Sequence, residues 1–158
     1  MIGSILKKDL PFIGKEITDW TQFIRRGYAL SFLLYSFHDT GVFNYLKDGK
    51  KRSVKDIAKK LRLDEKILSG GLNFFSNADN SIIKDNSGKF RISKIGKKRI
   101  FANQTLAMSL GAVGAYNVIL TQYPAAMQKK KFYGKDFIRD GRLVATSSVL
   151  TGQANYPW

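Results

Sequence analysis

Apolar residues follow a helical period over three stretches of the first half of the chain. Nearly every position from 29 to 37 is apolar, which predicts a helix that must be covered on every side, in part by a second subunit. The motif at residues 41–46 is expected to close this helix. Residues 53–61 carry apolar side chains at i, i+3, i+4 and i+7 behind Ser53, a residue type that caps helix N-termini. A third helix is predicted from the N-cap Asp64 to about residue 78, with Ile67, Leu68, Leu72, Phe74 and Phe75 on its buried side.

Two adjacent glycines interrupt the pattern of this third helix. Gly70 and Gly71 each cost roughly 1 kcal/mol relative to alanine in a helix interior, so the sequence predicts an irregular helix here. Beyond it, Ile82 and Ile83 face Phe90 and Ile92 across a four-residue loop that ends in glycine. That arrangement predicts a β-hairpin.

The second half of the chain is expected to be helical. A long helix is predicted from about Thr105 to Gln122, with a continuation past Pro124 as the alternative, and a last one from Leu143 to Leu150. Ala107, Gly111 and Ala115 lie four residues apart, and such a stripe of small residues lets another helix approach closely. Both an intrachain contact and a contact with a second subunit fit this stripe.

The order helix, helix, helix, hairpin predicts a winged helix. The fold class is therefore mainly α with a small β-hairpin, flanked by long N-terminal and C-terminal dimerisation helices. We divide the chain into an N-terminal arm (1–19), a winged-helix dimerisation domain (20–98) and a helical extension (99–158). The dimer interface candidates are Leu30, Leu33, Leu34, Phe37, Ala107, Gly111 and Ala115.

The chain is strongly basic. Its 27 lysines and arginines against 12 acidic residues give a formal net charge of +15, which attracts polyanions. A biased base composition that enriches lysine, asparagine, isoleucine and phenylalanine explains the charge equally well. Residues expected to make non-specific contacts with polyanions are Lys50, Lys51, Arg52, Lys89 and Arg91.

The sequence excludes several kinds of chemistry. There is no cysteine, so neither disulfides nor thiolate metal sites can form. His38 is the only histidine and Asp39 follows it directly, but adjacent helix residues point apart and no serine is placed to complete a triad. No signal peptide or spanning segment is evident, so we expect a cytoplasmic protein without a membrane partner.

Several of these segments together carry a family resemblance. Gly41-Val42-Phe43-x-x-Leu46, Ser53-Val54-x-x-Ile57-Ala58, Leu63-Asp64-x-x-x-Leu68 and a wing ending Phe90-Arg91-Ile92-Ser93-x-x-Gly96 occur in this order. They resemble the N-terminal dimerisation domain of S-adenosylmethionine-dependent O-methyltransferases over about residues 20–98. Residues 133–137 and Tyr156-Pro157 look like that family's link to its catalytic domain.

The resemblance implies an accessory role. It implies dimerisation, and it implies a cofactor, S-adenosylmethionine, held by a catalytic domain whose glycine-rich loop this sequence does not contain. The chain is then either a fragment of a longer enzyme or synthase, or a subunit that completes one in trans, and it is inactive alone. Its expected partners are a second copy or a catalytic partner and the small-molecule substrate of the complete enzyme. The candidates for lining the substrate pocket are Trp20, Phe23, Tyr116 and Tyr123.

A winged-helix transcriptional regulator is the alternative function. Basic residues between Lys47 and Arg62 and along the wing could contact phosphates. However, the third helix would read the bases, and it carries three acidic residues and one lysine between Asp64 and Asp79. We therefore expect only non-specific binding of nucleic acid, at low salt.

Overall fold

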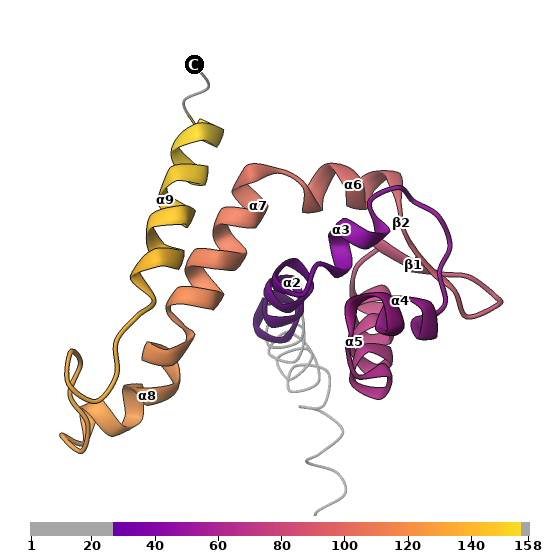
Figure 1. Cartoon of the computed structure of the whole chain (residues 1–158). Helices are drawn as coiled ribbons and strands as arrows, with labels where there is room; N and C mark the ends of the chain where they lie inside the picture. Colours follow the sequence, from indigo (N-terminus) through magenta and orange to yellow (C-terminus); the bar gives the residue numbers. More distant parts are fainter. Residues whose placement is uncertain (1–26, 156–158) are drawn as a thin grey trace, which may run out of the picture.

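The computed structural model of the chain describes residues 27–155. These residues form a mainly helical fold with one small antiparallel sheet, which confirms the predicted fold class (Figure 1). The helices are α2 (Leu30–Asp39), α3 (Val42–Leu46), α4 (Val54–Leu61), α5 (Glu65–Ala78), α6 (Lys94–Ile100), α7 (Asn103–Met108), α8 (Asn117–Met127) and α9 (Gly141–Asn155). A π-helical segment, η2 (Ser109–Ala115), joins α7 to α8, and the two strands are β1 (Ile82–Lys84) and β2 (Phe90–Ile92).

The elements α3 to α6 and the hairpin gather on one side of α2, and α7, η2 and α9 lie on the other side (Figure 1). On the winged-helix side, α2 packs against α3 and α5, and α5 also contacts α4 and β1. On the other side, α2 contacts η2, and α9 lies along both α7 and η2. The all-apolar helix is therefore covered largely by other parts of the same chain.

A core of aliphatic and aromatic side chains holds the winged helix together. Three phenylalanine rings meet at its centre, with Phe37–Phe43 centroids 5.6 Å apart and Phe43–Phe75 centroids 5.7 Å apart, both edge to face. Such pairs add to the hydrophobic gain from burial. The buried residues of this core are Phe37, Val42, Phe43, Leu46, Ile57, Ala58, Leu68, Leu72, Phe75, Ile82, Phe90, Ile92 and Ile100.

The helices α4 and α5 begin at the capping residues that the sequence predicted. The Ser53 side chain accepts a hydrogen bond from the amide of Asp56, and the Asp56 carboxylate accepts in return from the Ser53 amide, which forms a capping box. Asp64 likewise accepts from the amide of Ile67 at 2.8 Å. In the wing, Ile82 pairs with Ile92, which confirms the predicted hairpin.

Other predicted boundaries were wrong. Residues 41–46 do not close α2: Gly41 has a left-handed φ of 77°, and a separate short helix, α3, follows it. An unpredicted helix, α6, follows the wing because Ser93 caps it by accepting from the amide of Gly96 at 2.8 Å. The last helix is longer than predicted. The long helix includes the π-helical η2, and it takes the longer of its two expected forms by continuing past Pro124 to Met127.

The glycine pair does not disrupt the third helix. The helix α5 runs without a break through Gly70 and Gly71. A Cβ on Gly71 would lie 3.1 Å from Leu33 Cδ2 and 3.2 Å from Phe37 Cζ, so this glycine lets α2 pack closely against α5. Ile67, predicted to be buried on α5, is instead 77% exposed, because the core contacts of this helix begin one residue later at Leu68.

Candidate functional site

A groove runs between α2 on one side and α5, α6, α7 and η2 on the other. It consists of two cavities, of about 320 and 220 Å³, and Ser31, Leu34 and Thr105 line both. The larger cavity is lined also by Leu30, Phe75, Asp79, Ser81, Arg99 and Ile100, and the smaller by Met108, Ser109, Ala112 and Val113. The volume of the larger cavity and the mainly apolar walls of both are those of a small-molecule site.

An ion pair supplies polar groups at one end of this groove. Arg99 Nη1 on α6 lies 3.3 Å from Asp79 Oδ2 at the end of α5, and the Asp79 carboxylate also accepts from the amide of Ser81 at 2.7 Å. The Arg99 side chain is 62% exposed. A guanidinium has five N–H donors, so Arg99 can hold Asp79 and still donate to a polar atom of a ligand.

The sequence did not indicate this groove. Asp79 and Arg99 are 20 residues apart, and α6 was not predicted, so nothing placed them together. Leu30 and Leu34 were named as dimer candidates, and both prove to line the larger cavity. The groove could not be located from the sequence, because it depends on how α2 packs against η2.

The predicted pocket residues do not come together. Trp20 and Phe23 lie outside the described residues. The Tyr116 hydroxyl accepts a hydrogen bond from Arg139 Nη1 at 2.9 Å, and the Tyr116 ring lies beside a different, shallow cavity between η2 and α9. Tyr123 is 59% exposed on α8.

The predicted dimer residues make contacts within the chain. Phe37 is a core residue. The small-residue stripe packs against α9: the Ser147 hydroxyl donates to the carbonyl of Ala107 at 2.7 Å, and a Cβ on Gly111 would overlap Ser147. Gly114 similarly admits the ring of Tyr35 from α2. Ala107 and Ala115 are fully buried, whereas Leu30, Leu33 and Leu34 are half-buried against the core.

Part of the predicted polyanion surface is engaged in ion pairs. Arg52 binds both carboxylate oxygens of Asp48, at 2.6 and 2.7 Å, and its guanidinium lies 4.3 Å from the centre of the Tyr45 ring. The hydrogen bonds from Arg52 hold the pKa of Asp48 well below its usual range. Lys51 pairs with Asp85 at 3.0 Å. These two basic residues therefore stabilise the loop before α4 and the wing.

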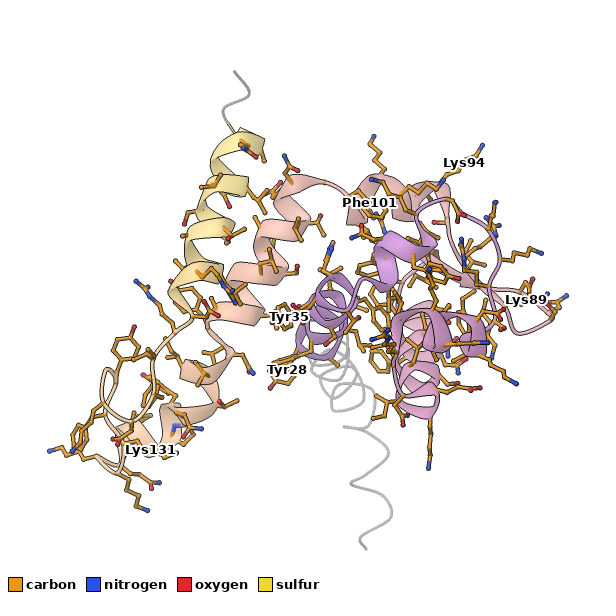
Figure 2. All side chains as sticks on the ribbon, in the orientation of Figure 1. Tyr28, Tyr35, Lys89, Lys94, Phe101 and Lys131 are labelled. Carbon is orange, nitrogen blue, oxygen red and sulfur yellow. The ribbon has the colours of Figure 1, made fainter. Side chains whose placement is uncertain are left out.

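The other three predicted contacts differ in exposure. Lys50 and Lys89 are exposed, and Lys89 lies at the wing (Figure 2). Arg91 is half-buried in β2 opposite Ile83. An exposed lysine attracts phosphate without reading sequence. The surface therefore suits non-specific attraction.

The helix that would read DNA bases carries two amide side chains: Asn73 is already occupied, whereas Asn77 is exposed. The amide nitrogen of Asn73 donates to the carbonyl of Ser69 at 2.8 Å, and its amide oxygen accepts from Lys84 Nζ at 2.8 Å. Base reading by asparagine needs both of these atoms. Asn73 would have to break two intrachain hydrogen bonds to read adenine.

His38 lies in apolar surroundings. Its ring meets that of Phe43 edge to face with centroids 4.9 Å apart, and within the described residues Nε2 is buried without a hydrogen-bond partner. Burial lowers the pKa of His38. Asp39 beside it is exposed, and in residues 27–155 no group of three or more potential ligands could hold a metal ion.

No family model matches the chain, and the search of curated proteins found no similar protein. Among residues 27–155 no helix combines the length and the apolar character needed to cross a bilayer.

Proposed function

We propose that this chain is the dimerisation and substrate-walling portion of an S-adenosylmethionine-dependent O-methyltransferase, acting within a longer enzyme or as a subunit beside a catalytic partner. The groove between α2 and the α7–η2 segment is the observation that carries the proposal. Its apolar walls and the Asp79–Arg99 pair at one end suit an aromatic methyl acceptor with a polar substituent.

The placement of the glycines supports an accessory role. A cofactor loop requires glycines in the turn between a strand and a helix. Gly70 and Gly71 lie inside α5, and Gly111 and Gly114 lie inside η2, where they serve helix packing. This placement supports a cofactor that is held by another domain or subunit.

The regulator is the weaker alternative because of Asn73. A winged helix that reads DNA needs free amide or guanidinium groups on its third helix, and Lys84 and Ser69 engage the side-chain amide of Asn73.

The half-buried α2 residues also leave room for a second copy, so a homodimer stays part of the proposal. Light scattering after size exclusion will measure the oligomeric state.

A ligand screen tests the groove. Hydroxylated aromatic compounds, titrated to about 100 times their dissociation constant, should stabilise the chain by about 2.7 kcal/mol in thermal unfolding. Thr105→Trp, at a residue that lines both cavities, should fill the groove and abolish this stabilisation. Ala145→Trp on the exposed side of α9, outside the groove lining, is the matched control and should leave it unchanged.

Two results would contradict the proposal. Stabilisation that survives Thr105→Trp, or the absence of stabilisation by any aromatic acceptor, would remove the groove as a substrate wall. Calorimetric titration with S-adenosylmethionine should give no heat with this chain alone. Micromolar binding of the cofactor would mean that the chain is not an accessory portion.

A further inference from the structure

The helix α8 and the turn after it, residues 117–139, extend away from both the winged helix and α9, and we call this segment the α8 arm (Figure 1). No residue of α8 is buried. The arm nevertheless carries a concentration of exposed large apolar side chains: Leu120, Tyr123, Met127, Phe132, Tyr133 and Ile138. An exposed apolar patch of this kind usually marks an interaction surface.

Hydrogen bonds hold the outer turn of the arm in a fixed conformation. The amide of Phe132 donates to Asp136 Oδ2 at 2.8 Å, and the amide of Asp136 donates back to the carbonyl of Phe132 at 2.9 Å. Gly134 takes a left-handed φ of 88° and donates to the carbonyl of Phe137. This turn leaves Phe132 54% exposed and Tyr133 57% exposed. Two aromatic side chains are thus presented to the outside by a preformed turn.

The outer end of the arm is strongly basic as well as apolar. Residues 127–142 contain six basic and two acidic residues. Both acids are occupied locally, because Asp136 accepts from the turn and Asp140 accepts from the amides of Arg142 and Leu143 at the start of α9. Within residues 27–155, no ion pair involves Lys129, Lys130 or Lys135. Figure 2 shows Lys131 at the outer end of the arm, on the opposite side of the view from Lys89.

We propose that the outer end of the α8 arm docks onto the surface of an anionic lipid bilayer. Clustered lysines beside exposed aromatic and aliphatic side chains provide both components of peripheral membrane binding: attraction to anionic headgroups and burial of apolar side chains at the interface. We expected no membrane partner because no segment of the sequence could span a bilayer. Surface docking requires no spanning helix.

The chemistry of the patch favours a bilayer over other occupants. Single-stranded nucleic acid binds by stacking bases on aromatic rings, and Met127 and Ile138, which are 71% and 63% exposed, offer no ring for stacking. A second copy of the arm would bring two like-charged ends together, which is unfavourable.

Vesicle flotation tests this docking with the whole chain at about 100 mM salt. The chain should float with vesicles of phosphatidylserine and phosphatidylcholine, and far less with phosphatidylcholine alone. Replacing Lys129, Lys130 and Lys131 with glutamine should weaken binding roughly a hundredfold, about fivefold for each lost charge. The same change at Lys94, Lys97 and Lys98 on α6 is the matched charge control and should have much less effect.

An apolar pair of variants completes the test. Phe132→Ser with Tyr133→Ser should weaken vesicle binding at least about tenfold, since both rings lose their burial in the interface. Ile67→Ser, at an exposed apolar position on α5, should change it little. Circular dichroism should show all variants folded, because every altered side chain is exposed.

The outcomes separate the possible partners. Binding that is equal for both vesicle types, or that the α6 and arm variants reduce alike, would overturn the proposal in favour of general adhesion or general charge attraction. Loss of oligonucleotide binding in the arm variants, with vesicle binding unchanged, would assign the arm to nucleic acid.

Discussion

The contact between Gly111 in η2 and Ser147 in α9 provides the sharpest test of how the small-residue stripe packs. A Cβ added at Gly111 would lie 2.2 Å from Ser147 Oγ and 2.8 Å from Ser147 Cβ, far inside van der Waals contact. Ser147 Oγ also donates to the carbonyl of Ala107 at 2.7 Å. Gly111→Ala must therefore displace a hydroxyl that is already hydrogen-bonded, and then move α9 itself.

The magnitude follows from these contacts. Losing the hydrogen bond from Ser147 costs about 1 kcal/mol. Overpacking that shifts a neighbouring element costs about 1–3 kcal/mol. Alanine in place of glycine returns about 1 kcal/mol of helix propensity. We expect Gly111→Ala to lower the free energy of unfolding by about 1–3 kcal/mol, measured by urea denaturation followed by circular dichroism.

A double-mutant cycle identifies the partner. Ser147→Gly removes both atoms that the new methyl group would meet, so Gly111→Ala should cost about 1–2 kcal/mol less in that background. If the stripe instead packed against a second copy elsewhere, the two changes would add without coupling. Additive free energies would refute the intrachain packing of α9 on η2.

Three further predictions address stability and nucleic-acid binding. Gly70→Ala should raise the free energy of unfolding by about 0.5–1 kcal/mol, because the added Cβ enters open space. Gly71→Ala should raise the free energy of unfolding less, or lower it, because the added Cβ meets Leu33 and Phe37. A loss of stability in Gly70→Ala, measured by thermal unfolding, would contradict this account of α5. The unfolded chain takes up a proton at His38 near pH 6.5, whereas burial lowers the pKa of His38 in the folded chain. The free energy of unfolding should therefore fall as the pH drops from about 7 towards the folded pKa of His38. His38→Gln should flatten this part of the pH dependence of the melting temperature, and an unchanged slope would show that His38 is not the group responsible. In gel shifts, DNA binding should lack sequence preference and disappear near 200 mM salt, because its affinity falls roughly a thousandfold or more from 50 mM. Asn73→Ala should not change the affinity for DNA. A preferred DNA site whose binding depends on Asn73 at physiological salt would favour the regulator.

The sequence alone determined the features that depend on neighbouring residues. Ser53 and Asp64 fixed two helix starts because a cap needs only the amides two or three positions away. The wing followed from apolar residues on both sides of a glycine-containing turn, although Ile83 pairs with Arg91 and not with Phe90 or Ile92. These local signals were enough for the fold class.

Only the tertiary structure decided which surfaces meet. The stripe through Gly111 predicted a close helix contact, but the packing of α9 was needed to identify Ser147 as the neighbour within the chain. The groove likewise depends on Asp79 and Arg99 meeting across 20 residues. The exposed turn at Phe132 follows α8, a helix that contacts η2 but has no buried residue. Periodicity shows which face of a helix is apolar but not which element covers it, because that choice is set by contacts between residues far apart along the chain.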